Sequence, residues 1–454
     1  GGLAATLLPA AEGRRRPFPD AAELQSACYF AYALRLDLPG SNHHTIRGAD
    51  FQRKAADFYA GLPVAAPLDE ATWLLSLPTS FQEQIVKECP AMLVLSYLLL
   101  AEVKLYVDPP VASEFWEIAQ SVLSGLSPRL VGMLAESWPV EAAVARFQAA
   151  GAAVRGRQAL APAGLSVDFV VAHCREDLRW LRAALARWAR PGLARLLLYE
   201  KCGEDSGAEE GWPLPTVSVQ VVDDGPGGST DECGAYLSHL IAVAPSPAEA
   251  ADYTFFLQAD ALHHSRARLL DLVVTSIRNG ALDVPFLHLS SASMVSSFSP
   301  CKRAIYEQVM GRPQTIAARG YCCAQFLVRR DRLANLGPQG WQAALAAMSS
   351  PLPAGCESAR QGLGMHCLVY ESLWHVMFGL GERLSPRAED VSLPTFLRFP
   401  EVDASNLPDG MNSTMYLTNA AGEDSGTAWL DELEREGAGD VAGAKSIGYM
   451  TNPG

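Results

Sequence analysis

A strongly apolar segment followed by polar residues marks the middle of the chain. Residues Tyr253–Leu257 are all aromatic or apolar apart from one threonine, which predicts a strand buried on both faces. Asp260 follows directly, and then His263 and His264. Open α/β sheets bind ligands beyond the carboxyl ends of their strands, so Asp260 is a candidate ligand for a substrate or a hard cation. The alternative is that Asp260 caps the next helix, for which Ser265 is an equally good N-cap.

Helical spacing dominates the region before this segment. Apolar and aromatic residues recur every three or four positions, as at Leu93, Tyr97 and Leu100, and prolines separate the helical segments. The pattern predicts an all-α N-terminal domain at 21–153. Residues 1–20 are rich in Ala, Gly, Pro and Arg and predict an extended leader.

An Ala/Gly/Pro-rich linker is predicted at 154–164, and strands alternate with helices after it. Strands are predicted at 167–172, 194–199, 217–222, 253–257, 286–289 and 324–328. The helices between and after them are predicted at 178–188, 229–244, 269–277 and 362–381. This order predicts an α/β domain at 165–395. The remainder, 396–454, has few apolar residues and predicts an extended tail.

Composition and charge narrow the class of protein. The chain has 454 residues, of which 49% are hydrophobic and 19% charged, so we expect a large buried core. Its net charge of −14 argues against a nucleic-acid or anionic-membrane partner. The longest apolar run, at 91–101, is too short for a transmembrane segment. Since the chain begins with Gly1 rather than Met, we expect a targeting segment that this chain lacks, and an organelle or secretory lumen rather than the cytosol.

The ten cysteines show neither a C-x-x-C metal pattern nor the density of a disulfide scaffold. They predict mostly buried thiols. A serine or cysteine hydrolase has little support, because no G-x-S-x-G motif occurs and Cys174 has no evident partner to orient the neighbouring His173.

The α/β half resembles a GT-A glycosyltransferase domain. Residues 167–188 are similar to its opening strand and helix, 255–262 to its strand and Asp-x-Asp turn, and 324–337 to its acceptor-side strand and Arg-containing turn. A closer similarity, to the domain-of-unknown-function family 3431, lies in the segments HCREDLRWL (173–181), FLQADALHH (256–264) and YESLWHVMFG (370–379). The resemblance covers about half of the chain and leaves out the helical N-terminal domain.

The resemblance implies a GT-A-like, Rossmann-like mixed sheet flanked by helices and a nucleotide-sugar donor. Mn²⁺ or Mg²⁺ would be held by Asp260 with His263 or His264. The donor itself would be bound by a second set of residues, namely His173, Glu176, Asp177 and Arg329. The sequence departs from the family pattern at the second Asp of Asp-x-Asp, where it has Leu262 or His263.

Glu371 and His375 are the candidate catalytic residues. They lie four positions apart in a predicted helix and would share one face of it, as acid–base pairs and metal ligands do. A surface Glu–His pair is the alternative. We expect this pair to converge with Asp260 and one of His263 and His264 on a single pocket, because unpaired buried polar groups are costly.

Two functions remain open from the sequence. One is sugar transfer from a nucleotide-sugar with a divalent metal. The other is a catalytically silent GT-A-like subunit of a larger, perhaps organellar, complex, in which protein partners order the leader and the tail. The incomplete Asp-x-Asp motif favours the second function.

Overall fold

The computed structural model of the chain describes residues 94, 97–98, 101–125, 140–161, 164–188, 190, 192–202, 211–220, 231–263, 265, 267–290, 292–295, 299–321, 323–354, 356, 365–387, 389–398 and 402–403. The chain folds into two compact units. The first comprises Gly1–Gly156 with Val391–Phe399, and the second is formed mainly by Arg157–Asp390. The predicted leader and most of the predicted tail lie outside the described residues. The described tail residues form η5 (Thr395–Leu397) and β9 (Val402–Asp403).

The described part of the first unit is largely helical. Its longest helices are α5 (Pro109–Gly125) and α7, which begins at Val140 and continues into the second unit as far as Leu160. Trp116 of α5 stacks on Phe147 of α7, with ring centroids 4.7 Å apart. The linker predicted at 154–164 is therefore helical over its first half. Residues 154–160 include Arg, Gln, Ala and Leu, which are good helix formers, so α7 continues through them.

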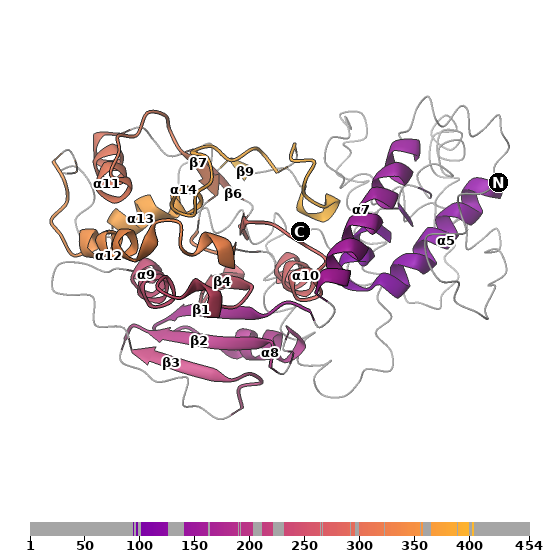
Figure 1. Cartoon of the computed structure of the whole chain (residues 1–454), viewed down its shortest axis with the longest axis horizontal. Helices are drawn as coiled ribbons and strands as arrows, with labels where there is room; N and C mark the ends of the chain where they lie inside the picture. Colours follow the sequence, from indigo (N-terminus) through magenta and orange to yellow (C-terminus); the bar gives the residue numbers. More distant parts are fainter. Residues whose placement is uncertain are drawn as a thin grey trace, which may run out of the picture. The chain divides into compact units, whose positions relative to one another are not determined.

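A six-stranded mixed sheet forms the centre of the second unit, and helices flank it (Figure 1). The strand order is β3-β2-β1-β4-β8-β5. β1, β2, β3 and β4 run parallel to one another, whereas β8 pairs antiparallel with both β4 and β5. The strands span Val167–His173 (β1), Ala194–Glu200 (β2), Thr216–Gln220 (β3), Tyr253–Gln258 (β4), Phe286–His288 (β5) and Phe326–Arg329 (β8). The predicted α/β class is confirmed.

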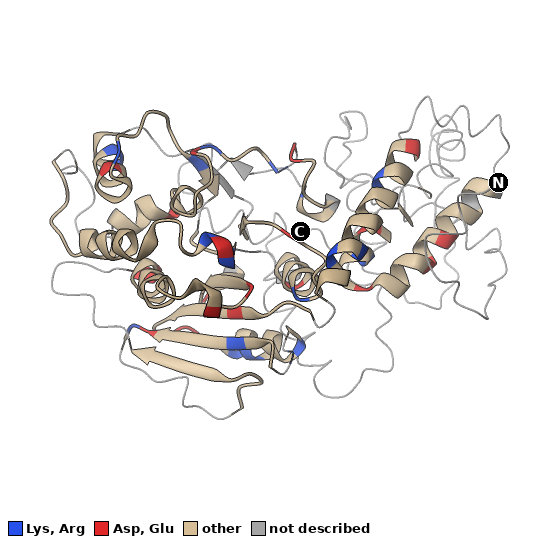
Figure 2. Cartoon of the chain, viewed as in Figure 1, with Lys and Arg blue, Asp and Glu red and all other residues tan. Residues whose placement is uncertain are grey.

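β4 lies between β1 and β8, and packing on both sides of the sheet buries its first five residues. Neither β3 nor β4 carries a charged residue, as Figure 2 shows. Successive side chains of a strand point to opposite faces. Phe255 stacks with Phe169 on one face, with ring centroids 5.5 Å apart. Phe256 packs on the other face against Phe326 at 4.9 Å and Tyr236 at 5.1 Å. The apolar run that predicted β4 therefore supplies the core on both sides.

Seven helices of the second unit lie within its described residues and begin after α7. They are α8 (Arg179–Trp188), α9 (Asp231–Val243), α10 (Ala267–Arg278), α11 (Pro300–Met310), α12 (Gly337–Met348), α13 (Met365–Glu371) and α14 (Trp374–Met377). The last two correct the single helix predicted at 362–381, since the chain leaves the helix at Ser372 and Leu373. The sequence pattern missed α11, α12 and a small sheet of β7 (Arg319–Tyr321), β6 (Ala292–Val295) and β9.

Disulfide bonds join distant parts of the second unit. The pairs are Cys174–Cys202, Cys233–Cys367 and Cys301–Cys356. The expectation of mostly buried thiols is therefore wrong for these six cysteines, whose spacing in the sequence gives no hint of the pairing. Such disulfides are typical of proteins that fold in an oxidising compartment. Among the described helices, none is both long and apolar enough to cross a membrane.

Truncating Phe256 should destabilise the second unit strongly. Its ring is fully buried between β1, β8 and α9. We expect Phe256→Ala to lower the free energy of unfolding by roughly 3–5 kcal/mol, because a large cavity remains. The control is Leu368→Ala, since Leu368 is 45% exposed. Urea unfolding followed by tryptophan fluorescence measures both changes, and equal losses in the two variants would contradict the packing.

Candidate active site at the carboxyl edge of the sheet

The carboxyl ends of β1 and β4 lie side by side at one edge of the sheet. Ala172 of β1 pairs with Gln258 of β4, and the Ala259 N–H donates to the Ala172 carbonyl oxygen at 3.0 Å. β5 runs in the same direction as β4, because both pair antiparallel with β8. Ala172, Asp260 and the end of β5 therefore lie along one edge of the sheet.

Three carboxylates from separate elements surround one tyrosine at this edge. Glu232 comes from the first turn of α9, Asp260 from the turn after β4, and Glu371 from the end of α13. Burial raises the pKa of the Tyr236 hydroxyl well above its usual value, and the three carboxylates raise it further. We call Glu232, Asp260 and Glu371 the acidic cluster.

The Tyr236 hydroxyl has no hydrogen-bond partner among the described residues, although its atom is fully buried. Leaving a buried hydroxyl unpaired costs about 1–3 kcal/mol. A polar ligand that reaches the acidic cluster can supply the missing bond. The cluster is therefore a candidate binding site and not merely a group of solvated acids.

Glu371 is the most perturbed carboxyl group of the cluster. Burial raises its pKa to about 8, and the negative charge of Glu232 adds to this effect. The backbone N–H of Cys323 donates to Glu371 Oε2 at 3.0 Å and opposes the rise, as does the nearby Lys302 ammonium. Glu371 therefore exchanges a proton close to neutral pH, which suits a general acid or base.

Glu232 is held in place by a chain of side-chain amides. Ser265 Oγ donates to Gln325 Oε1 at 2.7 Å, and Gln325 Nε2 donates to Gln258 Oε1 at 2.7 Å. The amide of Gln258 then donates to Glu232. Burial raises the pKa of Glu232 despite this bond. The Cys233–Cys367 disulfide ties the α9 turn that carries Glu232 to α13.

The chain offers limited means of holding a metal ion by itself. In the described part of the chain, three potential ligand residues come within 4.8 Å of one another only at Glu232, Cys233 and Cys367. Those cysteines form a disulfide, and metals bind thiolates. The acidic cluster supplies oxygen donors, which hard cations prefer, and Mg²⁺ commonly takes one or two carboxylates together with substrate phosphates. The cluster thus fits a cation that arrives with a phosphorylated substrate.

The residues predicted to bind the nucleoside are engaged within the protein. His173 Nδ1 donates to Glu200 Oε2 at 2.6 Å, and its Nε2 donates to the Glu176 carbonyl oxygen at 3.1 Å. Burial lowers the pKa of His173, but the hydrogen bonds to Glu200 and Glu176 and their negative charges together outweigh it, so the pKa is raised. The Glu176 carboxylate accepts from two backbone N–H groups of its own loop. Asp177 caps α8 and pairs with Arg179 at the surface.

The Cys174–Cys202 disulfide closes this loop, which also removes Cys174 as a nucleophile.

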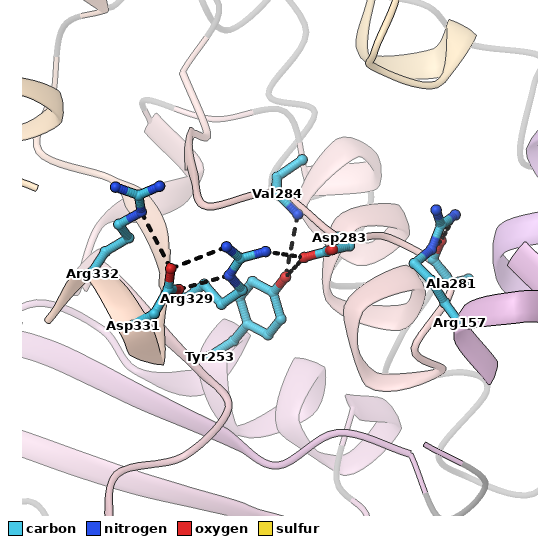
Figure 3. A network of polar contacts seen from close by, with 8 residues as sticks. All are labelled: Arg157, Tyr253, Ala281, Asp283, Val284, Arg329, Asp331 and Arg332. Atoms are coloured by element: carbon cyan, nitrogen blue, oxygen red, sulfur yellow. Dashed lines mark hydrogen bonds and ion pairs between the residues drawn. The ribbon is translucent and has the colours of Figure 1, made fainter. Parts of the chain in front are cut away.

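Arg329 lies at the opposite edge of the sheet from the acidic cluster. It pairs with Tyr253, the first residue of β4, because β8 runs antiparallel to β4. Its guanidinium binds Asp283 and Asp331 (Figure 3). Because β8 runs antiparallel to β4, Arg329 lies away from His173, with which it was expected to bind the donor.

His375 separates from Glu371 where α13 gives way to α14. Its Nε2 donates to the Glu382 carbonyl oxygen at 3.2 Å, and its ring lies 5.9 Å from that of His288. Burial lowers the pKa of His375 to about 4. The predicted Glu371–His375 pair on one helical face is therefore not formed. The side chains of His263 and His264 lie outside the described residues, so their predicted metal-binding role stays a prediction.

The sequence pattern missed two residues of this site. Glu232 fits a capping box opened by Ser229, and Tyr236 follows it by one turn of a predicted helix, so both suggested only helix formation. The only sequence feature that could have suggested a site here is the i, i+4 spacing of these two polar residues near the start of the helix predicted at 229–244.

Searches against protein-family models and against curated proteins find no match to the chain. What the site can do therefore follows from its own chemistry. It offers oxygen donors, a carboxyl group that titrates near neutral pH and an unpaired buried hydroxyl, at the edge where α/β sheets bind their ligands.

Replacing Glu371 by glutamine should remove a pH dependence of stability. The pKa of this carboxyl group rises from 4.5 to about 8 on folding, so the unfolded chain releases its proton first. The stability from the protonated group is complete below pH 4.5 and is lost as the pH rises through about 8. We expect Glu371→Gln to raise the melting temperature more at pH 8 than at pH 5, by differential scanning fluorimetry. The exposed Glu249→Gln is the control, and a difference that does not grow with pH contradicts the burial of this charge.

Acid should destabilise the protein through the buried pair His288 and His375. Burial lowers the pKa of both imidazoles below 6.5, and the neighbouring Arg387 lowers that of His288 further. Between pH 6.5 and about 4 the unfolded chain binds more protons, so stability falls as the pH falls. We expect the apolar variant His288→Leu to lose part of this dependence. Parallel melting curves of the two proteins from pH 7 to pH 4.5 would contradict the assignment.

Proposed function

We propose that the second unit is a GT-A-like domain that transfers a sugar from a nucleotide-sugar donor with the help of Mn²⁺ or Mg²⁺. The observation that carries the proposal is the acidic cluster around the unpaired Tyr236 hydroxyl, at the carboxyl end of β4. A GT-A domain has its Asp-x-Asp turn at the end of such a strand, and residues 255–262 resemble that strand and turn.

The roles follow from position and charge. Asp260 and a second carboxylate of the cluster would hold the cation, which neutralises the departing diphosphate. Glu371 would take the proton of an acceptor hydroxyl, which its pKa of about 8 supports. Lys302 adds a positive charge beside Glu371, and burial lowers the pKa of its ammonium group. Tyr236 would donate its hydroxyl proton to a bound oxygen.

A catalytically silent domain is the second candidate, and a specific observation favours it. Glu176 and Asp177 are already engaged with their own loop, and His173 with Glu200, so the nucleoside contacts implied by the resemblance are occupied. Such a domain would act as a structural subunit of a larger complex whose partners order the leader and the tail. Both candidates fit a secretory lumen or another oxidising organelle, given the disulfides Cys174–Cys202, Cys233–Cys367 and Cys301–Cys356.

Ligand-induced stabilisation tests the two candidates against each other. A panel of nucleoside diphosphate sugars is screened by thermal shift with and without Mn²⁺. A ligand at a hundredfold excess over its Kd stabilises the folded state by about 2.7 kcal/mol. We expect a shift that needs both the donor and Mn²⁺, and the loss of that shift together with transfer activity in Asp260→Asn.

The control variant is Glu249→Gln, which removes an exposed carboxylate of the η2 turn, at the opposite edge of the sheet. It should keep the shift if Asp260 acts through the cation. A panel in which no donor shifts the melting temperature, with Asp260→Asn as stable as the parent, would favour the silent domain instead.

A further inference from the structure

A cavity lies at the amino edge of the sheet, opposite the acidic cluster. Its volume is about 700 Å³, within the range of small-molecule sites. The end of α7, the η2 turn (Pro247–Glu249), the start of β4, the segment after α10 and the end of β8 line it. Much of the lining is apolar, formed by Leu160, Ala161, Leu165, Pro247, Ala248, Leu282 and Ala334. The cavity therefore combines a hydrophobic wall with the charged residues around it.

Each carboxylate that lines the cavity already has an arginine. Asp283 Oδ1 accepts from Arg329 Nη1 at 2.7 Å, and Asp331 Oδ1 accepts from Arg329 Nε at 2.7 Å (Figure 3). Asp252 Oδ1 accepts from Arg330 Nη2 at 2.7 Å, and Arg332 Nε lies 3.4 Å from Asp331 Oδ2, so Arg329 does not balance both of its acids alone. These acids need no cationic ligand, and together they repel a second negative charge placed near them.

Arg157 differs from the other arginines of the cavity. Its Nε donates to the Ala281 carbonyl oxygen at 2.9 Å, and its Nη2 donates to the same atom (Figure 3). A carbonyl is neutral, and among the described residues Arg157 has no ion-pair partner. A guanidinium has five N–H donors, so three remain after these two bonds. The Ala281 carbonyl holds the group in a fixed orientation, which lowers the entropy cost of binding an anion.

We propose that this cavity binds a small organic monoanion, whose carboxylate pairs with Arg157 and whose apolar chain lies on Leu160, Leu165 and Leu282. A single negative charge balances Arg157, while Asp283 and Asp331 disfavour a doubly charged phosphate. The site is separate from the acidic cluster and does not depend on the proposed transferase activity.

Isothermal titration calorimetry of the full chain with octanoate tests the site. Octanol carries a similar chain without the charge, and octyl phosphate carries a dianion on the same chain. We expect octanoate to bind at one site, and octanol to bind at least about tenfold more weakly, because a hydrogen bond to a charged group contributes about 1.5–3 kcal/mol. Octyl phosphate should bind more weakly than octanoate.

Two pairs of variants locate the bound anion. Arg157→Gln should weaken octanoate binding at least about tenfold, whereas Arg155→Gln, an exposed neighbour on the same helix, should leave it unchanged. Leu160 is 88% exposed, so charges introduced there leave the fold intact. Leu160→Lys should strengthen binding and Leu160→Asp should weaken it, which keeps the test valid if Arg157→Gln unfolds.

Four results would overturn the proposal. They are the absence of saturable octanoate binding, equal binding of octanol, tighter binding of octyl phosphate, and equal octanoate affinity in Leu160→Lys and Leu160→Asp.

Discussion

The pairing of β4 with β1 on one side and β8 on the other determines where every charged group of the second unit lies. Parallel register with β1 brings Gln258 beside Ala172, so Asp260 leaves the sheet next to the end of β1. Antiparallel register with β8 sends Arg329 to the opposite edge, beside Tyr253. One buried strand thus separates an acidic edge from an arginine-rich edge, and it can do so because its own side chains are uncharged and packed on both faces.

The buried carboxylates at the acidic edge repel one another, and a disulfide bond keeps the helices that carry two of them together. The charge of Glu232 raises the pKa of Glu371 only while α9 and α13 stay close together. The Cys233–Cys367 disulfide joins these helices, so the repulsion is not relieved by moving them apart. Lys302 and Lys201 offset part of the negative charge, and protonation or a bound cation can neutralise the rest. A structure that maintains such a pair beside an unpaired tyrosine hydroxyl has the properties of a binding site, because a purely structural core gains nothing from either feature.

The two edges handle charge in opposite ways. At the amino edge, Arg330 pairs with Asp252, Arg329 and Arg332 pair with Asp283 and Asp331, and the remaining guanidinium, Arg157, is held by a carbonyl. At the carboxyl edge the excess is negative and buried. Ligands of opposite charge therefore suit the two edges: a cation with its phosphorylated partner at one, and a monoanion at the other.

The sequence by itself determined the strands β1, β2, β4, β5 and β8 and the helices α8 and α10, because the alternation of apolar and polar residues reports local burial. It also placed Asp260 at a strand end. Only the tertiary structure decided which polar groups meet. The direction of β8 took Arg329 away from the site, and the break between α13 and α14 took His375 away from Glu371. The fold of α9 against α13 brought in Glu232 and Tyr236. Periodicity records whether a side chain is buried, whereas the meeting of distant residues depends on strand order and helix packing, which no local pattern contains.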